Sequence, residues 1–450
     1  MLTLKSWSLV VSFGARTFRS EARQGLIAPQ YLSKYGSRMS KSNRRTGQII
    51  FLLVCVVVVM TQSNMPTPLY SEFGRKFSID TFDITVIYAM YALGVALALV
   101  AGPSLAGRIG ERNLIIAALV GVVGANLLFV AAHAIGELVA ARVLTGIAAG
   151  VVMSVGTATI VELADPRARS FYALLATACN ILGMGIGPVL GGLAVTFLPH
   201  PIEWVFFTHM ALTTVLALCA AVLPRDVSEK ETPTGKFVAP SPPADPHFRR
   251  GFAGLCLIGV AGMGVLGLLA GLTPTFLHSI DPSTSYAVSG LVIGSVFAGS
   301  AVAQLLLKRV PDAMGLSLGT AGIVLGLGLF SAAVAVGNLA LFTVAATLCG
   351  LGQGLTIGRS VQVTSAHTTS ARDRIGSIAL FYLALYAGAS VPVIAVGVLQ
   401  RHIGLLSSAI IFTTFAALVS AFGLVTFLKC IRAYESASNR PARTATGQKG

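Results

Sequence analysis

Twelve apolar segments, each long enough to cross a lipid bilayer, dominate the sequence. A membrane-spanning helix needs about 20 mostly apolar residues, because an unpaired backbone amide is costly in hydrocarbon. The predicted spans are 48–70, 84–106, 114–134, 138–163, 171–197, 203–223, 251–277, 286–307, 315–336, 339–365, 376–399 and 404–428. Only 11% of the 450 residues are charged, whereas about a quarter of a soluble domain is charged. The sequence therefore predicts an all-α integral membrane protein.

A charged, proline-rich segment at 224–250 separates the sixth predicted span from the seventh. Its composition is typical of a solvated linker. We therefore expect one six-helix bundle at 47–223 and a second at 251–428, flanked by polar tails at 1–46 and 429–450. Because Met39 opens a basic stretch just before the first span, we hypothesise that translation starts there and that residues 1–38 are not in the mature protein. N-terminal sequencing tests this hypothesis, and a mature N-terminus at Met1 would contradict it.

The basic residues are distributed unevenly between the two sets of loops. Most of the 32 lysines and arginines fall in the tails, the linker and the loops on the same side as the linker. The opposite side holds only Arg75, Lys76 and Arg401. Since cytoplasmic segments are enriched in Lys and Arg, we expect both termini in the cytoplasm and a multi-pass protein of the plasma membrane, the inner membrane of a bacterial cell. The net charge of +15 thus indicates membrane topology, and no nucleic-acid partner is expected.

The two sets of six spans repeat short patterns at a nearly constant offset. The matching pairs are Thr67-Pro68 with Thr273-Pro274, Gly146 and Gly150 with Gly350 and Gly354, and Arg167 and Arg169 with Arg372 and Arg374. Parallel repeats of this kind place a substrate site at their interface, near the middle of the membrane. Rocking of one half against the other would then expose the site to each side in turn.

Three local motifs carry most of the functional information. Span four holds Arg142 inside an apolar helix, where a charge costs about 2.5–3.5 kcal/mol on insertion scales. Small residues at helical spacing allow two helix backbones to approach closely, and spans four and five are rich in them. The packing glycines, with one proline, are Gly146, Gly150, Gly183, Gly187, Pro188, Gly191 and Gly192. The loop after span two carries the third motif, Arg108, Gly110 and Arg112.

Over about residues 47–430, these motifs resemble those of the major facilitator superfamily. The resemblance implies two six-helix pseudo-repeats. In that family the loop after span two latches the outward-facing state, but here Gly107 replaces the usual aspartate. We expect Glu162 to serve as a partner for Arg108 or Arg112. The span-five motif is similar to that of the drug:proton antiporter branch, which implies efflux.

Several polar residues in the spans are candidates for a site. For Arg142, the resemblance implies a role in proton transfer or substrate charge, and the alternative is a side chain that extends to the lipid headgroups. The same alternative is stronger for Arg359, near the end of span ten. Asp83 and Glu162 are candidate proton carriers, although no acid lies at the centre of a span. We expect each uncharged candidate either to line a cavity or to form a hydrogen bond between helices. They are Gln62, Asn64, Asn180 and Gln353.

These observations predict a secondary transporter of small organic solutes, with proton-coupled efflux of drug-like or metabolite compounds as the first hypothesis. Uptake or facilitated passage of a small metabolite without protons is the alternative, favoured by the missing central acid. The sequence has no G-x-x-x-x-G-K-[ST] motif, so ATP-driven transport is not expected. Six cysteines lack ligand-like spacing. We therefore expect no disulfide, metal, cofactor or enzymatic activity, and a monomer in the bilayer.

Overall fold

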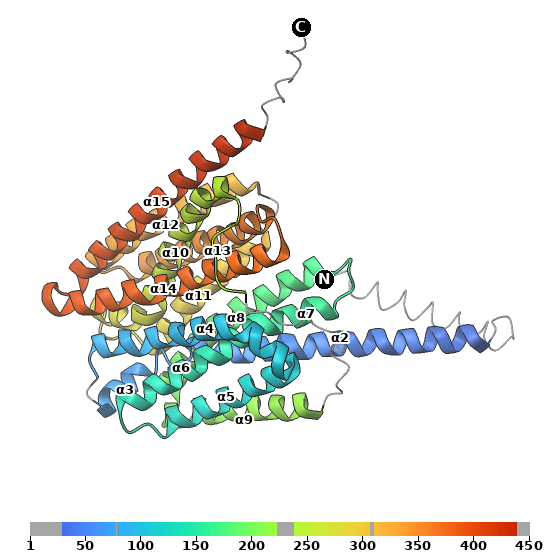
Figure 1. Cartoon of the computed structure of the whole chain (residues 1–450). Coiled ribbons are helices and arrows are strands. Elements are labelled where there is room, and N and C mark those ends of the chain that lie inside the picture. The colour runs from blue at the N-terminus through green and yellow to red at the C-terminus, as the bar shows by residue number, and fades with distance from the viewer. Residues whose placement is uncertain (1–28, 78, 223–237, 307–309, 439–450) are drawn as a thin grey trace, which may run out of the picture.

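A computed structural model describes residues 29–77, 79–222, 238–306 and 310–438. Throughout these residues the regular structure is helical, with no strand. Twelve helical segments are long and apolar enough to cross a membrane, which confirms the predicted number. Figure 1 shows two helix bundles that meet on one side and splay apart toward the end of the last helix (Leu405–Ser438) and the start of α2.

The N-terminal bundle contains the first six spans. Its long helices are α2 (Pro29–Asn64), α4 (Thr81–Ile109), α5 (Glu111–Val130), α6 (Ile135–Val151), α8 (Arg169–Phe197) and α9 (Pro201–Val222). Span four continues beyond α6 through a wider π-helical turn, η1 (Val152–Gly156), into α7 (Thr157–Leu163). A short helix, α3 (Tyr70–Phe77), connects α2 with α4. We call the end of the spans where it lies the α3 side.

The C-terminal bundle contains the other six spans. Its helices are α10 (Pro246–Ile280), α11 (Tyr286–Leu306), α12 (Asp312–Val336), α13 (Leu339–Ala366), α14 (Ala371–Ile403) and α15 (Leu405–Ser438). Residues 238–245 precede α10 and pack on the start of α14, where the Ala244 N–H donates to Asp373 Oδ1 at 2.9 Å. We call this end of the spans the linker side.

The two bundles repeat the same helix pairings, as the sequence echoes predict. Helix α4 packs on α6 in the first bundle, and α11 packs on α13 in the second. The matching glycines serve this contact in both: a Cβ at Gly146 would overlap the Tyr91 carbonyl oxygen, and one at Gly350 would overlap that of Val296. The bundles themselves meet along two seams, α8 with α11 and α4 with α14.

The glycines of α8 face two partners at once. Within the same bundle, Gly183 and Gly187 lie against the backbone of α2, and Gly191 lies against the Met65 carbonyl directly after α2. Gly192 lies against the Tyr286 carbonyl of α11, in the other bundle. The span-five motif therefore forms one packing surface inside the N-terminal half and another at the interface between halves.

Some predicted boundaries are wrong. Span one was expected to reach residue 70, but α2 ends at Asn64. Pro66 and Pro68 follow directly, and proline lacks the N–H that would continue the helix. Two helices also extend beyond the membrane spans: α2 starts at Pro29, within the tail, and α10 starts at Pro246, within the linker segment. Expectations for residues 1–28, 223–237 and 439–450 lie outside the described residues.

Candidate functional site

A cavity of about 710 Å³ lies between the two bundles. Helices α2, α8, α10, α11, α13 and α14, together with η1 and the start of α7, contribute its lining. Arg167, Ser170 and Gln362 line its end on the linker side, where the bundles splay apart. The cavity thus occupies the place where two rocking repeats would hold a solute.

The deeper part of the cavity is apolar and adaptable. Its apolar lining side chains include Met60, Met153, Met184, Met263, Phe297 and Tyr386. The Tyr386 hydroxyl donates to the sulfur of Met153 at 3.6 Å, which joins the two halves above the cavity. Methionine is unbranched and polarizable, so a surface rich in it can adjust to ligands of different shape.

Two of the four predicted cavity-lining residues line this cavity. Asn180 lies on α8, and its Nδ2 donates to the Ala176 carbonyl at 3.3 Å. Gln353 lies on α13, and its Oε1 accepts a hydrogen bond from the Ser300 hydroxyl at 2.7 Å. Gln62 and Asn64 are buried between helices and do not line it. The Asn64 amide donates to the Met184 carbonyl, so the interhelical alternative describes it.

Arg142 is completely buried in the N-terminal bundle, so it does not extend to the headgroups. Its Nε donates to the Tyr70 hydroxyl at 2.5 Å, and its Nη1 donates to the Ser63 carbonyl. The guanidinium also lies 5.6 Å from the centre of the Tyr88 ring. Ser63 is in the last turn of α2, where carbonyls lack helical partners and the helix dipole is negative. These groups stabilise the charge, and no ion pair with a carboxylate forms in the described part of the chain.

Arg359 is also largely buried and does line the cavity. Its Nη1 lies 3.3 Å from Asp312 Oδ1 and donates to Gln362 Oε1 at 2.8 Å. The expected extension to the headgroups is therefore wrong for Arg359, because an acid at the start of α12 holds the side chain inward.

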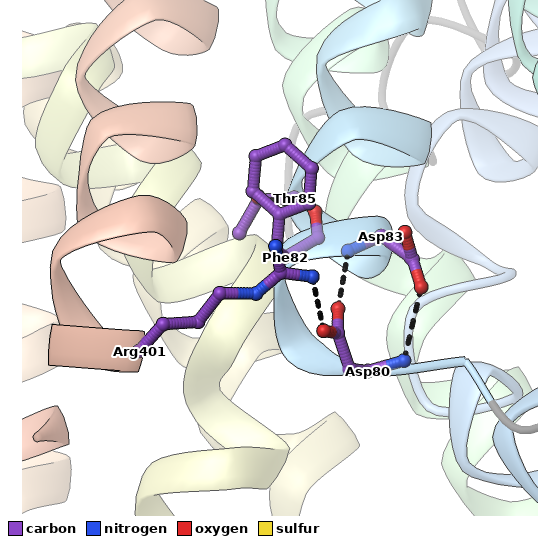
Figure 2. Close-up of polar contacts among 5 residues, drawn as sticks. All are labelled: Asp80, Phe82, Asp83, Thr85 and Arg401. Carbon is purple, nitrogen blue, oxygen red and sulfur yellow. Dashed lines mark hydrogen bonds and ion pairs between the residues drawn. The ribbon is translucent and has the colours of Figure 1, made fainter.

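An ion pair joins the two bundles on the α3 side (Figure 2). Asp80 precedes α4, and Arg401 lies in the last turn of α14. The Arg401 guanidinium also lies 4.4 Å from the centre of the Phe82 ring. Both charged side chains are about half exposed. This contact closes the α3 side of the interface, and we call it the α3-side latch.

Asp83, a candidate proton carrier, caps α4 in this structure. The Asp80 N–H donates to Asp83 Oδ2 at 3.2 Å, and the Asp83 N–H donates to Asp80 Oδ1 at 2.9 Å. Figure 2 shows this reciprocal pair beside Arg401. A capping box of this kind stabilises a helix start. The capping contact thus gives Asp83 a structural role and orients Asp80 toward Arg401.

Close backbone contacts continue the closure along both seams. A Cβ at Gly192 would overlap the Tyr286 carbonyl, and one at Gly397 would overlap the Thr85 side chain. The interface is therefore tight on the α3 side, whereas the cavity opens on the linker side.

Arg112, in the motif after span two, forms its hydrogen bonds within its own bundle. Arg112 donates to the carbonyls of Ala220 and Ala221 at the end of α9, at 3.1 and 2.6 Å. The expected pairing of Glu162 with Arg108 or Arg112 is therefore wrong, since no such ion pair forms among the described residues. Gly110 forms the turn between α4 and α5. Its φ of 84° is a backbone conformation that residues other than glycine rarely adopt.

Sequence reasoning missed several residues of the interface. Asp80 and Arg401 are far apart in the chain, and no local pattern marks them as a pair. All four methionines of the cavity lining were also missed, because a methionine in an apolar helix looks like any packing residue. A buried histidine inside the N-terminal bundle was missed as well. His209 lies in α9, and its two ring nitrogens form hydrogen bonds with the Asn126 side chain at 3.1 Å and the Val58 carbonyl at 2.9 Å. Only its place within an apolar span could have singled it out.

Comparison with known proteins identifies the class to which this fold and cavity belong. Residues 52–391 match the Major Facilitator Superfamily, so the chain belongs to that family of membrane transporters. A segment is 29% identical over 223 residues to the putative multidrug resistance protein MdtD of Salmonella typhimurium, and covers 49% of this chain and 41% of that protein. MdtD of Salmonella paratyphi B matches at 28% over 222 residues. The chain thus matches less than half the length of these relatives.

Solved structures show the same fold. A bacterial homolog of the human lysosomal transporter Spinster, in an inward-facing and unoccupied conformation, superposes with a TM-score of 0.66 at 15% identity. The match covers 86% of this chain and 98% of that one. The occupied inward-facing form of the same homolog superposes with a TM-score of 0.62 at 14% identity, covering 89% and 99%.

Proposed function

We propose that this transporter exports small amphipathic organic compounds by alternating access. The observation that carries the proposal is the cavity of about 710 Å³ between the halves, lined by methionines and aromatic rings and closed on the α3 side. A volume of this order suits a drug-sized solute. The similarity of a segment to proteins named for multidrug resistance supports export. The span-five glycine motif supports it too.

We further propose that the protein lies in the plasma membrane with its linker side facing the cytoplasm. The supporting observation is the excess of lysine and arginine in the segments on that side. With this orientation the structure is open to the cytoplasm, so it represents the state that collects a solute for export. The α3-side latch would have to break before release.

Proton coupling is the proposed energy source, with Glu162 at the linker-side end of span four as the remaining acidic candidate and Arg142 as a residue that affects the state change. Uncoupled passage of a metabolite is the second candidate function. It is favoured by a specific observation: among the described lining residues of the cavity there is no aspartate or glutamate.

A compound-susceptibility panel in a host that lacks its own exporters tests export. We expect the chain to raise tolerance to some amphipathic compounds. Arg142→Ala should lose the effect, and Thr177→Trp should lose it too, because Thr177 lines the cavity. Membrane levels of each variant are measured in parallel. Unchanged tolerance to every compound, with the protein present in the membrane, would contradict export.

A further inference from the structure

We propose that the cavity selects amphipathic organic anions, with the acidic group beside Arg167 and Arg359 and the apolar body deeper among the methionines. This inference rests on the proposed function and adds the substrate class. It follows from three features of the lining: its charge, the depth at which each kind of group lies, and the neutral polar groups between them.

The charged groups that line the cavity are all positive. They belong to Arg167 and Arg359, and the described lining contains no aspartate, glutamate, lysine or histidine. Asp312 pairs with Arg359 from outside the lining, and Arg167 forms no ion pair within the described residues. The mouth therefore keeps a net positive charge. A cavity with low-dielectric walls of one sign concentrates ligands of the opposite sign.

The charge and the apolar surface lie at different depths. Arg167 lies two residues before the start of α8, and Met184 lies within α8, roughly 20 Å from that start at the usual rise per residue. Arg359 and Gln362 lie toward the linker-side end of α13, about two turns from Gln353. A solute with one acidic end and one apolar end would match this order when it enters from the linker side.

Neutral hydrogen-bonding groups occupy the middle of the cavity. Asn180, Ser300 and Gln353 lie there on three different helices. Asn180 Oδ1 is buried and has no hydrogen-bond partner in the described part of the chain. These groups can bond to hydroxyl or amide groups of a solute, but they offer no counter-charge to a cation. A buried cation without a counter-charge is costly, whereas a carboxylate can bond to a guanidinium through charge-assisted hydrogen bonds.

The test compares three probes that share a naphthylpropyl body and differ only in the end group. The end groups are a carboxylate, a primary amide and a trimethylammonium. Binding to the purified full chain is measured from the rise in unfolding temperature with probe concentration, since a ligand stabilises the state it binds. We expect the carboxylate to bind about tenfold more tightly than the trimethylammonium probe, as charged hydrogen bonds allow.

Substitutions test whether the preference for the carboxylate probe arises at the linker-side mouth of the cavity. Arg167→Gln should weaken carboxylate binding about threefold, the effect of a single exposed charge, and leave the amide probe unchanged. Arg359→Gln should weaken it more. Arg169→Gln is the matched control, because Arg169 lies two residues away and does not line the cavity. If Arg359→Gln unfolds, Arg167→Gln still decides the outcome.

Three results would overturn the inference. They are equal or tighter binding of the trimethylammonium probe, equal effects of Arg167→Gln and Arg169→Gln on carboxylate binding, and no binding of any probe up to its solubility limit. The susceptibility panel separates this failure from that of export: tolerance only to cationic compounds would leave export standing and refute the anion preference. Charge-ranked binding without any gain in tolerance would refute export and leave the preference standing.

Discussion

At the scale of single residues, Arg142 shows how a membrane protein keeps a charge buried without a carboxylate. The guanidinium bonds to the end of α2 and to Tyr70, and it contacts two aromatic rings. Its contacts hold together α2, α3, α4 and α6. Arg142 is therefore part of the structure of the N-terminal bundle in the state open to the linker side, whatever it contributes to coupling.

Replacing Arg142 should destabilise this bundle. Arg142→Ala leaves the Tyr70 hydroxyl and the Ser63 carbonyl without their donor, so we expect a loss of about 3 kcal/mol in the free energy of unfolding. Denaturant titration in mixed micelles measures this value. Arg169→Ala, an exposed arginine, should change it by less than about 0.5 kcal/mol. Equal effects of the two substitutions would contradict the structural role.

The α3-side latch should not respond to physiological pH. Partial burial raises the pKa of Asp80, but the Asp83 N–H and the Arg401 guanidinium outweigh it and hold that pKa below the ordinary 3.8. A lowered carboxyl pKa means that the contact is complete above pH 3.8 and is lost only as the pH falls through the lower folded-state value. Its stabilisation is therefore constant between about pH 5 and about pH 8.

Labelling of a cysteine in the seam next to the α3-side latch measures how the latch responds to pH. Thr85→Cys, in a chain whose six native cysteines are replaced, lies in the closed seam and is buried. Its rate of reaction with a membrane-impermeant maleimide, divided at each pH by the rate of a free thiol because the thiolate is the nucleophile, should stay constant between about pH 5 and about pH 8. Asp80→Asn should raise the labelling rate up to about fivefold, because an exposed ion pair contributes up to about 1 kcal/mol. A pH-dependent rate that Asp80→Asn abolishes would contradict this account.

At the scale of helices, the glycines of α8 decide how closely α2 and α11 approach. Gly187→Ala should destabilise the fold by about 1–3 kcal/mol, because the methyl group would overlap the Thr61 carbonyl of α2. Gly328→Ala is the control, since nothing lies within 4 Å of a Cβ at that position in α12. We expect that change to be neutral or stabilising by up to about 1 kcal/mol. Unfolding titrations compare the two, and similar losses would refute close packing at Gly187.

Gly192 belongs to the seam between halves, so its substitution should act differently. Gly192→Ala would place a methyl group against the Tyr286 backbone, which can relax if the two halves separate on the α3 side. We expect faster maleimide labelling of Thr85→Cys, by about fivefold or more for a strain of about 1–3 kcal/mol. Gly136→Ala, with open space around it, should leave the rate unchanged. An unchanged rate in Gly192→Ala would show that this contact does not hold the α3 side closed.

At the scale of the whole molecule, periodicity and loop charge were sufficient to predict twelve spans and two repeats. Apolar length and repeated glycines are local signals; the structure confirms the twelve spans and shows that the repeated glycines pack equivalent helix pairs in the two bundles. The site was less accessible from sequence. Of the four uncharged candidates, Asn180 and Gln353 line the cavity, whereas Gln62 and Asn64 lie buried between helices, because the facing direction of a polar group depends on how neighbouring helices are rotated. The Asp80–Arg401 pair depends on contacts between distant segments and has no local signature.

Transport through the interface cavity is the central claim, and solute movement in proteoliposomes tests it most directly. With the purified chain, an imposed pH gradient should drive the naphthyl carboxylate probe across the membrane faster than in protein-free vesicles. Thr177→Trp should abolish this movement by filling the cavity, and Leu212→Trp should retain it, because Leu212 is an exposed side chain on α9, away from the lining. Equal rates with and without the gradient would remove the proton from the mechanism. Movement that Thr177→Trp leaves unchanged would contradict the cavity as the transport path.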